Sequence, residues 1–295
     1  MKAFVLAERA DAAVSLCAGA RTIADEVVFV AIGDMSVPEQ IADTIAHITL
    51  PEGSLYEDAA GVVIAFFDAV SPEVIFVEPT RRLKIIAGRL AAHAGASTIT
   101  DVIEFDGVAA TNRYFGGIAH KTQKALGTAV YTVFADVFAD CVSSGANTVA
   151  ELDWIEPAHP LTLLSSRPLE KSGVDLFKAD AVVAAGRGFA QKEDLALARA
   201  LCDAIGAGLG CSRPLTEGVD WLPSEVYIGV SGLMLSPKVY IGVGISGQMQ
   251  HMVGCNRATT LFAINKDKNA PIFKQCDYGL VGDLKTVLPA LTAVL

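Results

Sequence analysis

The segment from Val226 to His251, VYIGVSGLMLSPKVYIGVGISGQMQH, constrains the fold more than any other part of the chain. It contains two runs rich in β-branched and aromatic residues, Val226–Val230 and Val239–Val243, and each run leads into a turn of small residues. Such runs favour short strands. Because glycine and serine carry no bulky side chain, the backbone N–H groups of these turns can approach a ligand closely.

The second run also carries the glycine spacing G-x-G-x-x-G, at Gly242, Gly244 and Gly247. A short helix is expected directly after it, and the unpaired N–H groups at a helix start favour an anion. In dinucleotide folds an acidic residue about 20 positions further binds the ribose, and Asp267 stands at that distance. Asp267 equally fits a polar turn at residues 265–269, so the motif alone leaves both interpretations open.

The composition is that of a globular protein long enough for two domains. The chain has 295 residues, of which 52% are apolar and 19% charged. The longest apolar run, Ala59–Phe67, is much shorter than the roughly 20 residues of a membrane-spanning helix. The N-terminal residues resemble neither a secretory signal nor a transit peptide. We therefore expect a cytoplasmic, prokaryotic protein without membrane insertion.

Charge and cysteine usage exclude several kinds of partner. A net charge of −10 with scattered lysine and arginine argues against nucleic acid as a partner. The six cysteines form no C-x-x-C pair and have no histidine at ligand spacing, so we expect neither a metal site nor a disulfide framework.

Strand and helix patterns alternate along the first half of the chain. Ala3–Ala7, Glu26–Ala31 and Val74–Val77 are expected strands, and helical patterns cover Tyr56–Val70 and Lys84–Ala94. Such alternation predicts parallel sheets built from βαβ units. Prolines then interrupt the periodicity over residues 151–171, so the boundary is placed there, with domains at 1–165 and 166–295.

The second half restarts the alternation, with expected strands at Ala181–Ala185 and Thr260–Ile264 and a helix at Lys192–Ala207. Small polar or cationic residues come directly after successive expected strands or turns. Ligands of open α/β sheets bind outside the carboxyl ends of the strands. The pattern therefore predicts a site for a phosphate-bearing cofactor, with these groups at its edge: Arg187, Ser212, Arg213, Ser231, Ser246 and Asn265.

Six stretches of the second half, in order and spacing, resemble the α subunit of electron transfer flavoproteins. They are VVAAGRGF, GCSRPLTEGVDWLP, IGVSG, SPKVYIGVGISGQMQH, FAINKDKNAPIF and DYGLVGDL, within residues 182–284. The first half is similar more loosely. The resemblance implies two doubly wound α/β domains with parallel sheets. The C-terminal one would be a Rossmann-like FAD-binding domain, and the N-terminal one a domain of the adenine-nucleotide-hydrolase type. It also implies a heterodimer with a β subunit, contacted by the N-terminal domain.

The resemblance further assigns roles by position. Arg213 would lie against the flavin ring, where a cation stabilises the anionic reduced form and raises the reduction potential. Ser231 would hydrogen-bond the reactive ring nitrogen. His251 would lie near the pyrimidine edge as a protonated or hydrogen-bond-donating imidazole. The full set of residues implied to contact FAD is Arg187, Ser212, Arg213, Ile228, Gly229, Val230, Ser231, Ser246, Gly247, Gln248, Met249, Gln250, His251, Asn265, Asp283 and Leu284.

Val230 departs from the family pattern, because many members carry a glutamine before the hydroxyl residue. A valine cannot supply that polar contact, which leaves the reduction potential open.

The leading hypothesis is an electron carrier between flavoprotein dehydrogenases of the acyl-CoA type and a redox acceptor. Alternatives are a subunit of an NADH-oxidising, electron-bifurcating complex and a nucleotide-binding regulatory or scaffolding protein. No nucleophile–base pair suggests a substrate-transforming enzyme.

Overall fold

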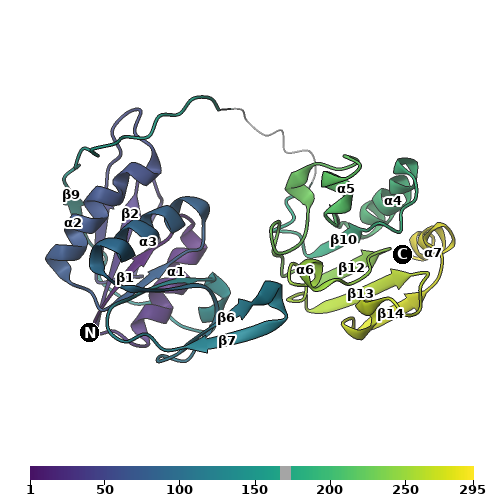
Figure 1. Cartoon of the computed structure of the whole chain (residues 1–295), viewed down its shortest axis with the longest axis horizontal. Helices are drawn as coiled ribbons and strands as arrows, with labels where there is room; N and C mark the ends of the chain where they lie inside the picture. The colour runs from purple at the N-terminus through teal and green to yellow at the C-terminus, as the bar shows by residue number, and fades with distance from the viewer. Residues whose placement is uncertain (167–173) are drawn as a thin grey trace. The chain divides into compact units, whose positions relative to one another are not determined.

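The computed structural model describes residues 1–166 and 174–295, and these form two compact units (Figure 1). The first unit takes Met1–Tyr114 and Ala119–Arg167, and the second takes Phe115–Ile118 and Pro168–Leu295. The boundary expected at residue 165 lies directly before residues 167–173, which are outside the described residues.

The first unit is built on a nine-stranded sheet with the order β7-β6-β5-β8-β4-β1-β2-β3-β9. Its strands are β1 (Lys2–Leu6), β2 (Glu26–Ile32), β3 (Thr44–Ile48), β4 (Val74–Val77), β5 (Ser97–Phe105), β6 (Ala110–Tyr114), β7 (Ala119–Gln123), β8 (Ala129–Val133) and β9 (Thr148–Leu152). Its helices are α1 (Ala10–Arg21), α2 (Ala60–Val70) and α3 (Arg81–Ala94), with short 3-10 turns at Tyr56–Ala59 and Ala135–Phe138.

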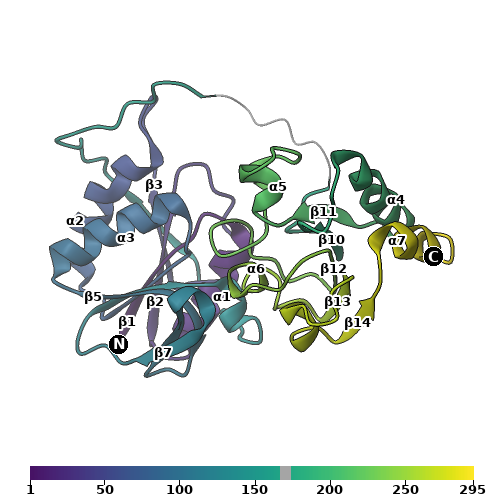
Figure 2. The ribbon, with the colours of Figure 1, turned by 45° about the vertical axis from the view of Figure 1, so that its right-hand side comes forward.

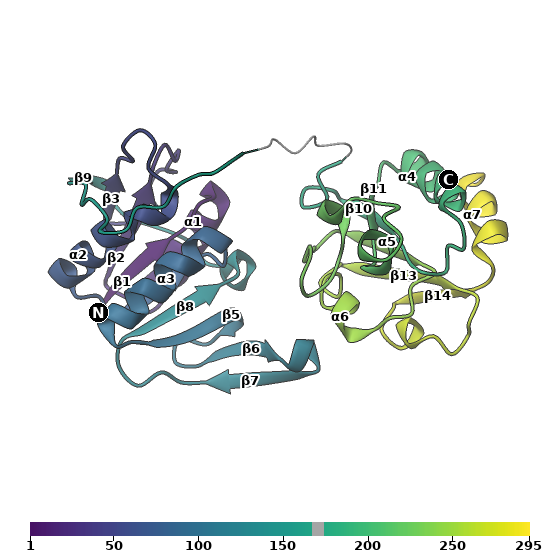
Figure 3. The same cartoon turned by 45° about the horizontal axis from the view of Figure 1, so that its top comes forward.

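Seven of these strands run parallel, while β5–β6 and β6–β7 pair antiparallel at one edge (Figure 3). Only Phe115–Ile118 separates β6 from β7 along the chain. A parallel connection requires a crossover of a dozen or more residues, so strands this close in sequence can pair only as a hairpin. The parallel sheet predicted from the sequence is therefore confirmed, and the hairpin extends it.

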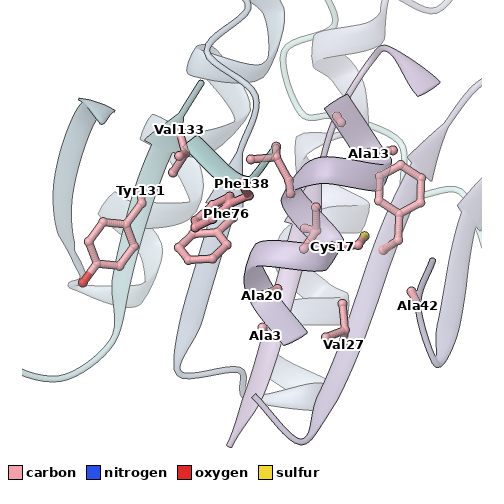
Figure 4. Packing of buried hydrophobic residues seen from close by; sticks show 14 of the residues in the cluster. Ala3, Ala13, Cys17, Ala20, Val27, Ala42, Phe76, Tyr131, Val133 and Phe138 are labelled. Carbon is pink, nitrogen blue, oxygen red and sulfur yellow. The ribbon is translucent and has the colours of Figure 1, made fainter. Parts of the chain in front are cut away.

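Alternate side chains of the central strands enter separate cores on the two faces of the sheet, as the period of two requires. In β1, Ala3 and Val5 pack with α1, and Phe4 and Leu6 pack with α2 and α3. The core on the α1 side contains an aromatic cluster in which the rings of Phe76 and Phe138 pack together, tilted by 33° (Figure 4). With helices on both faces, the strands are buried on both sides and read as apolar runs.

Helix α3 shows how local sequence sets an element's ends. The Thr80 hydroxyl accepts a hydrogen bond from the Leu83 N–H at 3.2 Å and caps the first turn. At the other end Gly95 adopts a left-handed conformation with φ +58°, which stops the helix.

The second unit carries a parallel five-stranded sheet with the order β11-β10-β12-β13-β14. Its strands are β10 (Ala181–Ala185), β11 (Gly208–Cys211), β12 (Val239–Val243), β13 (Thr260–Asn265) and β14 (Tyr278–Val281). Its helices are α4 (Leu195–Ile205), α5 (Pro214–Glu217), α6 (Met249–Met252) and α7 (Leu284–Thr292), with 3-10 turns at Lys192–Asp194, Ser224–Val226 and Pro271–Lys274.

Helices α4 and α7 lie side by side on one face of this sheet (Figure 2). The opposite face is covered by α6 and by the loops around Leu176, Leu235 and Ile272. The prediction of two doubly wound α/β domains is thus confirmed. Within residues 1–166 and 174–295, no helix is both long and apolar enough to cross a membrane.

One expected strand is wrong. Val226–Val230 forms no ladder, because a 3-10 turn at Ser224–Val226 leads into it and Gly229 turns the chain with φ +151°. Only isolated bridges remain, from Tyr227 to Cys211 and from Ile228 to Leu233.

The strand β11 was not expected from its sequence, GLGC. Its glycines are required by packing: a Cβ at Gly208 would lie 2.4 Å from the Leu176 side chain, and one at Gly210 would lie 2.4 Å from Ile228. Strands β3, β6, β7, β9 and β14 were also not among the expected elements.

Candidate functional site

The candidate site lies at the carboxyl ends of the strands in the second unit. In the order β11-β10-β12-β13-β14, the connection after β10 leads to β11 on one side, whereas β12 lies on the other side. The loops after β10 and β12 therefore leave neighbouring strands in opposite directions. This reversal of strand order creates the crevice in which open α/β sheets bind ligands.

Three glycines bring these two loops into direct backbone contact. The Gly188 N–H donates to the Gly244 carbonyl oxygen at 2.9 Å, and the Gly186 N–H donates to that of Val243 at 2.8 Å. A Cβ at Gly186 would lie 2.3 Å from the Gly244 oxygen, and one at Gly188 would lie 2.6 Å from the Gly244 Cα. Gly244 itself has φ +63°, which favours glycine. Two of these glycines, Gly186 and Gly188, belong to the stretch VVAAGRGF quoted in the sequence analysis.

The glycine motif therefore has a packing role in addition to any approach to a ligand. At Gly247, where φ is +87°, a Cβ would lie 2.3 Å from the Ile272 backbone nitrogen. The Ile272 N–H donates to the Ser246 carbonyl oxygen at 3.0 Å, which fixes this second loop against the 3-10 turn Pro271–Lys274.

A cavity of about 920 Å³ opens at this edge, and its lining residues belong to the second unit. This volume lies in the upper part of the range for ligand and cofactor sites. Eleven of the expected residues line it: Arg187, Ser212, Arg213, Val230, Ser231, Ser246, Gln248, Met249, Gln250, His251 and Asn265. Lining residues absent from the expected set include Gly188, Pro214, Tyr227, Gly244, Ile245, Asp267, Ala270 and Pro271.

Five expected residues do not line this cavity. Ile228 is fully buried, and Gly229 packs beneath the Gln250 backbone, whose oxygen would lie 2.8 Å from an added Cβ. Gly247 packs against Ile272, as described above. Asp283 caps α7 by accepting from the Lys285 N–H at 2.8 Å, and Leu284 belongs to the core beneath that helix.

Two arginines give the cavity a positive side although the chain as a whole is acidic. Arg187 is exposed in the turn after β10, and no described carboxylate pairs with it. Arg213, which precedes α5, pairs with Glu217 one turn later, with Nε 2.5 Å from Oε2. The hydrogen bond to Glu217 raises the pKa of Arg213. Arg213 is thus both a surface ion-pair residue and a cavity residue.

The hydroxyl and amide groups around the cavity are held by their own loops. The Ser231 hydroxyl lies 3.4 Å from that of Tyr227, and the Val230 N–H donates to the Gln250 carbonyl oxygen at 2.8 Å. Asn265 donates from Nδ2 to the Ile245 carbonyl oxygen at 2.9 Å, so the loops after β12 and β13 are tied together.

Asp267 stabilises the turn that contains it. Its N–H donates to Asn265 Oδ1 at 3.0 Å, and its carboxylate accepts from the Asn269 N–H at 2.9 Å. These contacts match the turn interpretation given for the polar residues 265–269.

His251 on α6 is 7% exposed, and its Nε2 lies 2.6 Å from the Tyr240 hydroxyl oxygen. Burial lowers the pKa of His251 to about 4, and the backbone of Ile228 opposes this only in part. The imidazole is therefore neutral at pH 7. Of the two forms expected from the sequence, the structure favours a neutral hydrogen-bonding imidazole over a cation.

These residues fit an anionic, polar cofactor. The cavity combines two guanidinium groups with serine and glutamine side chains, and its carboxylate, Asp267, is engaged in a turn. The Nδ1 of His251 is buried and has no hydrogen-bond partner among the described residues. A buried polar atom without a partner is costly, so a ligand group that satisfies it would be favoured.

Comparison with known proteins identifies the family. The model of the electron transfer flavoprotein domain matches residues 4–155, and that of the electron transfer flavoprotein FAD-binding domain matches residues 175–256. Proteins named FixB from Escherichia coli K12 and Shigella flexneri are 40% identical over 290 residues, covering 94% of this chain and 92% of theirs. The chain therefore belongs to the electron transfer flavoprotein family as an α-subunit-type, FixB-like member with an FAD-binding domain.

Proposed function

We propose that this chain is the FAD-binding α subunit of a heterodimeric electron transfer flavoprotein. It would pair with a β subunit through its N-terminal domain, residues 1–165. The complex would act in the cytoplasm of a prokaryote and carry electrons from flavoprotein dehydrogenases of the acyl-CoA type to a redox acceptor. The observation that carries the proposal is the convergence of Arg187, Arg213, Ser231 and His251 on one cavity in the FAD-binding domain.

Each group would have a distinct task. The FAD would supply the electron-accepting ring, and the protein would hold it and set its potential. Arg187 and Arg213 suit the negative charges of the pyrophosphate and the reduced ring, since guanidinium groups remain cationic at every physiological pH. The Ser231 hydroxyl can donate or accept a hydrogen bond as the ring changes protonation. We also assign to FAD binding the expected residues outside the cavity lining: Ile228, Gly229, Gly247, Asp283 and Leu284.

The decisive experiment is to co-purify this chain with its β subunit and to measure flavin content and absorbance. One FAD per heterodimer, reduced by an acyl-CoA dehydrogenase with its substrate but not by NADH alone, supports the proposal. Two flavins, one of them reduced directly by NADH, would favour an electron-bifurcating complex instead. A colourless heterodimer that takes up no added FAD would contradict the cofactor assignment.

A variant pair localises the cofactor. Arg187→Ala removes the cavity cation without a described carboxylate partner, whereas Arg199→Ala removes an exposed arginine of α4 that does not line the cavity. We expect weaker FAD binding in Arg187→Ala and unchanged binding in Arg199→Ala. Equal affinities in the two variants would place the cofactor elsewhere.

A further inference from the structure

A buried tyrosine lies beside the one histidine among the residues that line the cavity. Tyr240 is the second residue of β12, and its side chain is fully buried. Its hydroxyl oxygen is 2.6 Å from Nε2 of His251, which comes from α6, beyond the glycine-rich turn. This distance is short for a hydroxyl–imidazole pair and indicates a strong hydrogen bond.

All side chains of this group are neutral at pH 7. Burial raises the pKa of Tyr240 well above its ordinary value, and that of Cys255, which neighbours the tyrosine, to about 12. A neutral imidazole has one N–H and one acceptor nitrogen, and the hydrogen bond at one nitrogen decides which nitrogen carries the proton.

Two arrangements satisfy the short contact. In the first, the Tyr240 hydroxyl donates to Nε2, so the proton of His251 lies on Nδ1. In the second, Nε2–H donates to the tyrosine oxygen, and the tyrosine proton then needs another acceptor. The acceptor beside it is the Cys255 sulfur, which accepts hydrogen bonds only weakly, whereas an imidazole nitrogen is a strong acceptor, so the first arrangement is favoured.

The backbone beside the ring also favours the first arrangement. The Ile228 backbone favours a proton on the imidazole, since it acts to raise the pKa of His251. Because Nε2 is occupied by Tyr240, the nitrogen concerned is Nδ1. No described residue meets both the distance and the angle of a full hydrogen bond at that nitrogen, and His251 lines the cavity.

We propose that Tyr240 is a positioning residue that donates its hydroxyl proton to Nε2 of His251 and thereby fixes the Nδ1–H tautomer. His251 then offers the cavity a neutral hydrogen-bond donor in a set orientation. The ligand of this donor is the FAD of the proposed function, on which this part of the inference rests. His251 therefore contributes a hydrogen bond, and the positive charge of the site comes from its arginines.

The tautomer can be measured without any cofactor. The full chain is labelled with nitrogen-15 in its five histidine rings, and the His251 signals are assigned by their loss in His251→Asn. We expect a protonated-type signal from Nδ1 and an unprotonated-type signal from Nε2, unchanged between pH 8 and pH 5. The opposite pattern, or a ring that titrates near pH 6.5, would overturn the proposal.

Tyr240→Phe tests the cause. We expect the His251 signals to move toward a mixture of both tautomers, while Tyr131→Phe, which removes the hydroxyl of a buried tyrosine in the first unit, leaves them unchanged. An unaltered Nδ1–H tautomer in folded Tyr240→Phe would refute the role of the tyrosine. If that variant does not fold, the wild-type spectrum still decides the tautomer.

A third comparison asks which ring nitrogen serves the ligand. An asparagine amide nitrogen can occupy the position of Nδ1, and a glutamine amide nitrogen that of Nε2. We expect His251→Asn to bind FAD roughly threefold to tenfold more tightly than His251→Gln, the range for one hydrogen bond. The reverse order would overturn the donor assignment. FAD binding with the wrong tautomer refutes only this inference, whereas the right tautomer without FAD binding refutes only the proposed function.

Discussion

Arg213 and Glu217 form an ion pair across one turn of α5, with Nε 2.5 Å from Oε2, and the same arginine lines the cavity. Both side chains are more than half exposed, so the pair is worth little for stability. Its importance lies in the net charge that the arginine presents to the cavity, because the carboxylate cancels part of it.

We therefore expect opposite effects from the two partners. Arg213→Ala should lower the reduction potential of bound FAD, since a cation near the ring favours its anionic reduced form. Glu217→Gln should raise the potential. Both shifts should shrink at high salt, because the groups are exposed and screened. Redox titration at two salt concentrations measures this, and equal shifts of one sign in both variants would contradict it.

The contact between Gly188 and Gly244 predicts that a single methyl group disrupts the site. Gly244→Ala introduces a Cβ 2.8 Å from the Gly188 Cα and forces alanine to φ +63°. We expect the free energy of unfolding to fall by about 3 kcal/mol or more, and FAD binding to be lost.

Gly206→Ala is the matched control for backbone strain. Gly206 ends α4 with φ +65°, but an added Cβ meets nothing within 4 Å. Strain alone should cost about 1–2 kcal/mol. Urea unfolding of both variants separates strain from steric contact, and equal losses would show that the contact does not matter.

A pH dependence should arise at the edge of the first sheet. His47 of β3 bonds Glu151 of β9 through Nδ1 at 2.8 Å and the Gly33 carbonyl oxygen through Nε2 at 3.1 Å. The hydrogen bond to Glu151 has the largest effect and raises the pKa of His47 above 6.5. Partial burial acts to lower this pKa, while the hydrogen bond to Gly33 and the charges of Glu151 and Asp34 raise it further.

A raised pKa in the folded state stabilises the protein fully below pH 6.5, and this contribution is lost as the pH rises through the folded-state pKa. The free energy of unfolding should therefore decline over that interval in the wild type, and less so in Glu151→Gln. Chemical unfolding at a series of pH values measures the difference. Parallel curves for the two proteins would exclude the pair as the cause.

Thiol reactivity should follow burial. Burial raises the pKa of Cys202 to about 11 and those of Cys211 and Cys255 to about 12, and Cys17 is also buried. Because the thiolate is the reactive form, these four should resist iodoacetamide at pH 8 in the folded chain. Cys141 and Cys276, which are partly exposed, should be labelled first, as mass spectrometry of tryptic peptides would show.

The sequence predicted those strands whose residue pattern matches their burial in the folded sheet. Val239–Val243 and Ala181–Ala185 are strands with the expected bounds, because apolar runs flanked by glycine suit a sheet buried on both faces. Val226–Val230 has the same composition but becomes a loop. Nothing local distinguishes it, since the decisive influence is its packing against β11 and the α6 backbone.

The candidate site shows the same division. The polar residues after each strand were predictable, because a chain leaving a parallel strand must appear at the ligand-binding edge. The resemblance also implied Asp283 and Leu284, which follow the outer strand β14 and do not line the cavity. The hydrogen bond between Tyr240 and His251 could not be foreseen, since it depends on how the turn between them folds back.

The loops of the second unit are joined mainly through the main chain, as in the hydrogen bonds from the Gly188 N–H to the Gly244 oxygen and from the Val230 N–H to the Gln250 oxygen. Because the main chain makes these links, exposed side chains of the loops can be changed while the loops and the sheet keep their places. A library that varies only Val230 and Ser231, on a loop outside the sheet, would offer an engineer graded redox carriers on one unchanged scaffold.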